Sequence, residues 1–122
     1  MFIIYSVERS NLSALENQVR HLAELMELKD LGIPFQTVNG TYNGVQETSI
    51  KVDRAFSALI KDRAFKADQE SVLVVNAEST AFLVFQSGEV KKIGSWVETT
   101  QEYSGDRSVI NGRVYTVKAG AK

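Results

Sequence analysis

The sequence predicts an α+β protein in which two helices pack on one face of a ferredoxin-like, mostly antiparallel sheet. The first observation is the order of local patterns along the 122 residues, which reads strand, helix, strand, strand, helix, strand, strand. The second is that each helical pattern carries one apolar stripe, as expected of helices that cover a sheet. The third is the shortness of the segments between the later strands, which is typical of antiparallel hairpins. A chain of this length fits one domain, so residues 1–122 are expected to fold as a unit.

The first strand and the first helix have clear local signals. The apolar run Phe2–Ser6 is rich in β-branched and aromatic residues and predicts a buried strand. Ser13 and Glu16 have the spacing of a capping box, and Gly32 and Pro34 end the helix that follows. Apolar residues at three- and four-residue steps form its stripe: Leu12, Leu15, Val19, Leu22, Leu25, Met26 and Leu28.

The middle of the chain predicts four more strands and a second helix. Phe35–Val38 and Val45–Val52 resemble strands joined by a glycine-rich loop, and Asp53 can cap the next helix. The apolar face of that helix consists of Ala55, Phe56, Leu59, Ile60 and Ala64. Ser71–Asn76 and Thr80–Phe85 predict an antiparallel hairpin, because only a short polar segment separates them.

The remainder of the chain has weaker signals. A turn at Ser87-Gly88 leads into a short strand at Val90–Ile93. Residues 99–112 are polar and rich in turn formers, and a last strand-like piece follows at Val114–Val117. Residues 99–122 are therefore interpreted as a tail without an assigned role.

Three of the predicted strands carry apolar residues at consecutive positions. They are Phe2–Tyr5, Val72–Val75 and Phe82–Phe85. A sheet with one solvated face shows strict alternation instead. Both faces of this sheet are therefore expected to be buried, which favours a homo-oligomer with its sheets facing inward.

Composition argues against several classes of function. The net charge is −1 with acidic and basic residues interspersed, so no basic stripe suited to nucleic acid is present. Cysteine is absent and the single histidine is His21, so no cofactor or metal site is expected. No apolar run approaches the roughly 20 residues that span a bilayer, and the N-terminus does not resemble a signal peptide. We expect a cytoplasmic protein without a membrane or nucleic-acid partner.

The segment from residue 40 to residue 50, GTYNGVQETSI, is the strongest candidate for a binding site. Gly40 and Gly44 bracket Tyr42, and glycine permits close approach of the backbone to a ligand. Glu47 follows at the start of a strand, which would hold its carboxylate on a rigid element. Further polar residues of the segment are Thr41, Thr48 and Ser49. The alternative interpretation is a plain hairpin turn with a solvated glutamate at its exit.

The order of short motifs along the chain resembles the phage-encoded enzymes that degrade S-adenosylmethionine, known as SAM hydrolases and better described as SAM lyases. The motifs are RSNL at residues 9–12, the glycine-rich segment with Glu47, and QESVLV at residues 69–74. The resemblance extends from about Arg9 to Trp96. The motifs are individually short, so their order and spacing carry the comparison.

The resemblance implies a lyase reaction that needs little catalytic equipment. The methionine carboxylate attacks its own γ-carbon, which gives homoserine lactone and methylthioadenosine, so the protein mainly orients the substrate and excludes water. Glu47 would hold the substrate's α-ammonium group, or act as a general base if water were the nucleophile. Tyr42 would anchor the substrate through its hydroxyl or face the sulfonium with its ring, although it can also simply cover a turn. Gln69, Glu70 and Ser71 would contact the adenosine, or merely connect a helix to a strand.

The resemblance also implies a PII-like homotrimer with its sites between subunits. Lowering the SAM concentration would counter SAM-dependent restriction in the host cytoplasm. Two other functions remain open: a PII-like oligomeric module that binds a nucleotide-type ligand without catalysis, and a host-takeover protein that acts by direct protein contact. Formation of methylthioadenosine from SAM separates the enzyme from both.

Overall fold

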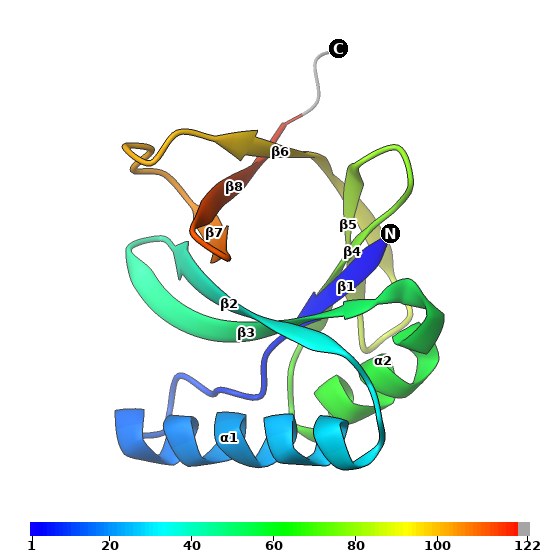
Figure 1. Cartoon of the computed structure of the whole chain (residues 1–122). Coiled ribbons are helices and arrows are strands. Elements are labelled where there is room, and N and C mark those ends of the chain that lie inside the picture. Colours follow the sequence, from blue (N-terminus) through cyan, green and yellow to red (C-terminus); the bar gives the residue numbers. More distant parts are fainter. Residues whose placement is uncertain (120–122) are drawn as a thin grey trace.

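The computed structural model, which describes residues 1–119, is a closed barrel of eight antiparallel strands with two helices on one side (Figure 1). The strand order around the barrel is β1-β3-β2-β7-β8-β6-β5-β4. In chain order the elements are β1 (Phe2–Tyr5), α1 (Ala14–Asp30), β2 (Phe35–Tyr42), β3 (Val45–Asp53), the 3-10 helix η1 (Arg54–Phe56), α2 (Ser57–Lys66), β4 (Ser71–Val75), β5 (Thr80–Phe85), β6 (Val90–Thr99), β7 (Arg107–Ile110) and β8 (Arg113–Lys118).

The prediction of an open, ferredoxin-like sheet is wrong because the C-terminal region closes the sheet on itself. β7 and β8 form a hairpin around the turn Asn111-Gly112, within the part of the chain interpreted as a tail. β7 pairs with β2, with Gly40 opposite Ser108, while β6 pairs with both β5 and β8. β2 also continues four residues beyond the predicted strand, so the connection to β3 shrinks to the tight turn Asn43-Gly44, both at positive φ.

Barrel closure accounts for the strands that are apolar on both faces. On the outer face of β4, Val72 belongs to a core cluster that includes Leu28 of α1 and Ile60 of α2. On the inner face, Leu73 packs against a second cluster that includes Ile4 and residues of β2 and β7. Both faces are thus covered within one chain. The apolar residues of these strands are therefore no evidence for a neighbouring subunit. The homotrimer stays a prediction.

Helix α1 faces the barrel with only part of the predicted apolar stripe. Its capping box is confirmed, because Ser13 Oγ accepts from the Glu16 amide and the Glu16 carboxylate accepts from the Ser13 amide. The residues that α1 buries against the barrel, however, are His21, Glu24 and Leu28. Of the predicted stripe, Leu28 is buried and Leu25 packs against the same core. Four other members are exposed, namely Leu15, Val19, Leu22 and Met26.

A buried charged cluster holds both helices to the barrel. The Tyr5 hydroxyl of β1 donates to the Glu24 carboxylate of α1, and Arg63 of α2 donates to both Glu24 oxygens, at 2.7 and 2.9 Å. Arg63 also pairs with Glu27. Burial by itself would raise the pKa of Glu24, but the hydrogen bonds from Arg63 and Tyr5 outweigh it and hold that pKa below its usual range. Burial and the Glu24 carboxylate raise the pKa of Tyr5.

We predict that Glu24→Gln destabilises the fold by about 1.5–3 kcal/mol at neutral pH, since it removes charge-assisted hydrogen bonds at constant shape. Because the folded-state pKa of Glu24 is lowered, the carboxylate stabilises the fold above its unfolded pKa. This stabilisation disappears as the pH falls through the folded-state pKa of Glu24. Urea unfolding of both proteins should therefore show a difference at neutral pH that shrinks in acid.

The control is Asp62→Asn, which removes the exposed pair with Lys66 and should change stability little. An equal loss for Glu24→Gln at neutral and acidic pH would contradict the electrostatic account.

Candidate active site

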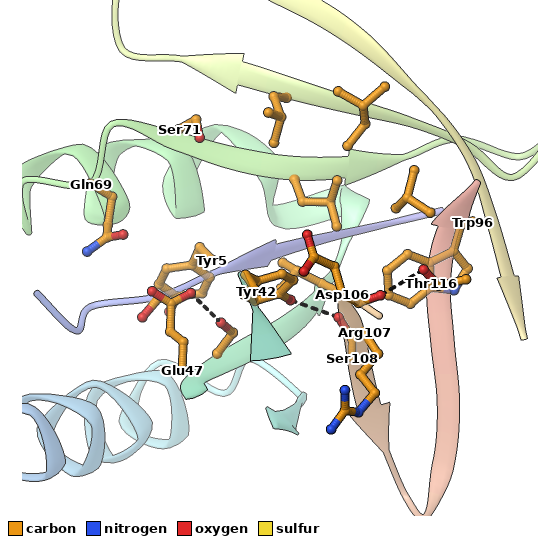
Figure 2. Close-up of a pocket in the computed structure, with 17 residues that line it drawn as sticks. Tyr5, Tyr42, Glu47, Gln69, Ser71, Trp96, Asp106, Arg107, Ser108 and Thr116 are labelled. Carbon is orange, nitrogen blue, oxygen red and sulfur yellow. Dashed lines mark hydrogen bonds between the residues drawn. The ribbon is translucent and has the colours of Figure 1, made fainter. Parts of the chain in front are cut away.

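A cavity of about 520 Å³ occupies the inside of the barrel and is lined by residues from all eight strands. One part of its wall is apolar and consists of Leu73, Leu83, Ile93 and Trp96. The polar part consists of Tyr5, Ser6, Tyr42, Glu47, Ser49, Gln69, Ser71, Asp106, Arg107, Ser108 and Thr116. Most of these side chains are labelled in Figure 2. A concave space with an apolar wall and a few convergent polar groups is typical of a small-molecule site.

Glu47 is a carboxylate without a cationic partner among residues 1–119. It lies on β3 opposite Gly40 and is half-buried, and its nearest polar contact is the Ser49 hydroxyl, which donates at 3.4 Å. None of the ion pairs found among residues 1–119 includes Glu47. Burial raises the pKa of Glu47, and the negative charge of Glu8 raises it further. Such a carboxylate is suited to a cationic ligand, since pairing would offset the cost of its desolvation.

The Tyr42 ring packs over Gly40, and its hydroxyl forms a hydrogen bond between β2 and β7, the strand pair that closes the barrel. Its hydroxyl and Ser108 Oγ are 2.8 Å apart, which links β2 to β7 (Figure 2). A Cβ at Gly40 would lie only 2.5 Å from Tyr42 Cε2, so the ring occupies the space that a side chain at Gly40 would need. Burial raises the pKa of Tyr42, so the phenol is neutral near pH 7.

The segment after β1 passes the cavity and is fixed by two residues of the predicted site. The Thr48 amide donates to the Glu8 carboxylate at 2.9 Å, and Ser6 Oγ donates to the Thr48 carbonyl at 3.1 Å. Gln69 Nε2 donates to the Glu8 carbonyl at 2.6 Å. These contacts place a second carboxylate, Glu8, near Glu47.

An outer groove of about 940 Å³ adjoins the cavity. It lies between residues 8–17 and the strands β2, β3 and β7, and it shares Glu47 and Arg107 with the cavity. Glu47 is therefore reached from the barrel interior and from this surface groove.

The described residues offer no site for a metal ion, because no group of three or more His, Asp or Glu side chains is suitably placed among them. No helix in the same part of the chain has the length and apolarity needed to cross a membrane.

Comparison with protein families matches residues 3–118 to the S-Adenosylmethionine lyase family. The chain belongs to this family. This SAM lyase is therefore an enzyme that degrades S-adenosylmethionine, as the motif order indicated. A search of curated proteins found no match.

The structure brings together about half of the site residues predicted for the lyase. Tyr42, Glu47, Ser49, Gln69 and Ser71 line the cavity.

The other predicted residues lie elsewhere. Gly40, Thr41 and Thr48 line the outer groove together with Glu47. Gly44 is in the β2–β3 turn, and Glu70 is exposed, and neither lines either space.

Sequence reasoning missed the contribution of the C-terminal strands. The missed cavity residues are Trp96, Asp106, Arg107, Ser108 and Thr116. Asp106 also holds the β2–β3 turn, because its carboxylate accepts from the Asn43 amide at 2.8 Å. The available signal was Asn111-Gly112 between alternating apolar residues, which predicts a hairpin that reaches Ser108 and Thr116.

We predict that Gly40→Ala destabilises the lyase by about 1–3 kcal/mol, because the new methyl group overlaps the Tyr42 ring. Unfolding by urea measures the effect. The same substitution in a Tyr42→Leu background should cost much less, since the overlapping atoms are gone. An equal cost in both backgrounds would assign the effect to the backbone and contradict the role of Tyr42.

Proposed function

We propose that the SAM lyase binds its substrate in the barrel cavity and converts it to methylthioadenosine and homoserine lactone. The substrate carboxylate forms a bond to its own γ-carbon while the bond from that carbon to the sulfonium sulfur breaks. The electron pair stays on sulfur, which becomes the neutral thioether of methylthioadenosine. The observation that carries this proposal is Glu47, a partly buried carboxylate in the barrel cavity that has no cationic partner among residues 1–119.

Glu47 is assigned to the substrate's α-ammonium group. The nucleophile of the reaction is already ionised at neutral pH, so no activating base is needed. An ammonium group held at Glu47 fixes the Cα end of the methionine chain, and this restriction favours the ring-closing conformation. Ser49, which donates to Glu47, keeps the carboxylate oriented.

Tyr42 is assigned to the sulfonium through its ring, because its hydroxyl already bonds Ser108. A cation over an aromatic face is stabilised by roughly 0.5–2 kcal/mol. The apolar wall around Leu73, Leu83 and Trp96 excludes water from the reacting carbon, which favours lactone formation over hydrolysis.

The remaining predicted residues have roles of different kinds in this proposal. Ser71 and Gln69 contact the adenosine from the β4 side of the cavity, whereas Thr48 holds Glu8 and Gly40 accommodates Tyr42. Thr41 lines only the outer groove. A homotrimer with sites between subunits stays a prediction, and a neighbouring subunit would reach Glu47 through that groove.

Hydrolysis is the second candidate reaction, and the raised pKa of Glu47 favours it, because a general base works best with a pKa near the working pH. Isotope labelling in water enriched in oxygen-18 distinguishes the two routes. Direct hydrolysis places the label in the γ-hydroxyl of homoserine. Lactone formation followed by ring opening places it in the carboxyl group instead.

The biological role that we propose is depletion of SAM from the cell in which the enzyme is made. This depletion would starve methyltransferases and SAM-dependent restriction systems, as expected for a phage protein. The family assignment argues against the two non-catalytic alternatives, a PII-like ligand-binding module and a host-takeover protein that acts by contact alone.

We predict that Glu47→Gln lowers turnover of SAM by orders of magnitude and weakens SAM binding by about 1.5–3 kcal/mol, because one charge-assisted contact is lost. Release of methylthioadenosine measures turnover, and calorimetry measures binding. Glu70→Gln is the matched control, since Glu70 is exposed and outside the cavity, and it should keep near-normal activity. Near-normal turnover by Glu47→Gln would refute this assignment.

We also predict that kcat/KM falls in acid as Glu47 becomes protonated, at a higher pH than for an ordinary glutamate. Glu8→Gln removes the negative charge that helps to raise the pKa of Glu47. The acidic limb of the profile should therefore move to lower pH. Glutamine can still accept the hydrogen bond from the Thr48 amide, so the segment stays in place. An acidic limb unchanged by Glu8→Gln would show that another group controls it.

A further inference from the structure

Two residues border both the barrel cavity and the outer groove, and they carry opposite charges. They are Glu47 of β3 and Arg107 of β7, and every other residue among 1–119 that lines one of these two spaces lines only that one. Arg107 is also the single Lys or Arg side chain of the described residues that lines the cavity. The passage between cavity and groove is therefore flanked by one carboxylate and one guanidinium group.

The guanidinium group of Arg107 is not paired with another charged side chain. None of the ion pairs found among residues 1–119 includes it, and within this range its side chain donates to the Gly105 carbonyl alone, at 3.0 Å. Figure 2 shows it directed away from the Asp106 carboxylate. The other arginine of the groove, Arg9, pairs instead with Asp68 at 3.2 Å. A half-buried guanidinium with unused N–H donors is suited to a carboxylate ligand.

The sheet sets the spacing of the two charged residues. Glu47 lies opposite Gly40 of β2, and Gly40 lies opposite Ser108, the residue that follows Arg107 on β7. Two strand spacings therefore separate β3 from β7, which is about 10 Å. An α-amino acid carries its ammonium and carboxylate groups on one carbon atom, so with a hydrogen bond at each end it needs protein charges about 8 Å apart. The long side chains of Glu47 and Arg107 can reach that separation.

We propose that Glu47 and Arg107 form a clamp for the α-amino acid end of the substrate, in which Arg107 binds the carboxylate that attacks the γ-carbon. This inference rests on the proposed function, where Glu47 holds the ammonium group, and it adds the residue that holds the nucleophile. The clamp places the methionine end of SAM at the passage between cavity and groove and leaves the adenosine inside the barrel. Each charge of the α-amino acid end then meets an opposite charge of the protein.

The chemistry of ring closure determines what Arg107 contributes. The substrate carboxylate is fully charged before the reaction and uncharged in the lactone, because its charge and that of the sulfonium cancel as the C–O bond forms and the C–S bond breaks. A guanidinium contact is therefore strongest in the bound substrate and weaker in the transition state. Arg107 consequently strengthens binding of the substrate more than it lowers the barrier, and it selects ligands that carry a carboxylate beside the ammonium group.

Arg107→Gln tests the clamp with two ligands, SAM and decarboxylated SAM. Decarboxylated SAM keeps the ammonium and sulfonium groups but has no carboxylate, so it cannot form the lactone. In Arg107→Gln we expect the KM for SAM to rise about tenfold or more, because a charge-assisted contact is lost, while kcat changes less. The affinity for decarboxylated SAM, measured by calorimetry, should stay close to the wild-type value.

Arg113→Gln is the matched control. It removes the same charge from β8, at a residue that lines neither the cavity nor the groove, so the KM for SAM and the affinity for decarboxylated SAM should both stay unchanged. Retained binding of decarboxylated SAM also shows that the Arg107→Gln protein is folded and that its site is intact.

Two results would overturn the clamp: an unchanged KM for SAM in Arg107→Gln, and an equal loss of affinity for both ligands, which would assign the effect to the shape of the site. Glu47→Gln separates the clamp from the proposed function, because it should weaken binding of decarboxylated SAM through the ammonium group. That loss without a selective effect of Arg107→Gln would refute the clamp and leave the proposed function standing. Unchanged binding of decarboxylated SAM by Glu47→Gln would refute the role of Glu47 on which both depend.

Discussion

The pairing of β2 with β7 is the constraint on which the rest of this structure depends. Three residue pairs form it, and one of them places Gly40 opposite Ser108. Without this seam the strands would form an open sheet, and Glu47 would lie on a solvated face with ordinary properties. Closure encloses the carboxylate, and burial is the leading cause of its raised pKa. The electrostatic character of the site is therefore a consequence of a backbone ladder between residues that are almost 70 positions apart.

The cavity lowers the stability of the fold, because its lining lacks packing partners, and the core packed between the barrel and the helices offsets this loss. A barrel of eight strands can fill its interior with side chains, yet this interior keeps an open space beside hydroxyls and a partly buried carboxylate. The densely packed core lies instead between the barrel and the helices, around residues such as Ile3, Leu28, Ile50 and Ile60. The larger packed core thus lies on the outer face of the sheet, and the inner face combines a smaller apolar cluster around Ile4 with the cavity.

Local sequence signals predicted most elements but not their closure into a barrel. The bounds of β5 and the capping box of α1 agree with their local patterns, and β4 ends one residue before the predicted Asn76. Asp53 caps the 3-10 helix η1 rather than α2 itself. Motif order grouped Tyr42, Glu47 and Ser71 as candidate site residues, and the three line one cavity inside the barrel rather than a cleft between subunits. What could not be predicted was the partner of each edge strand. A strand of four residues such as β7 has no pattern that specifies pairing with β2, and closure is a non-local property.

Periodicity likewise predicted that α1 has an apolar stripe but could not determine the direction in which the stripe faces. Polar residues on the inner face of the helix hold the segment that follows β1. Arg20 donates to the Val7 carbonyl at 2.6 Å, and Asn17 bonds both the amide and the carbonyl of Arg9. These contacts hold the segment that carries Glu8, whose charge acts on Glu47. Because backbone groups of that segment need hydrogen-bond partners, polar residues must face the barrel. Leu25 and Leu28 still pack on the core, but Leu15, Val19, Leu22 and Met26 are left on the surface.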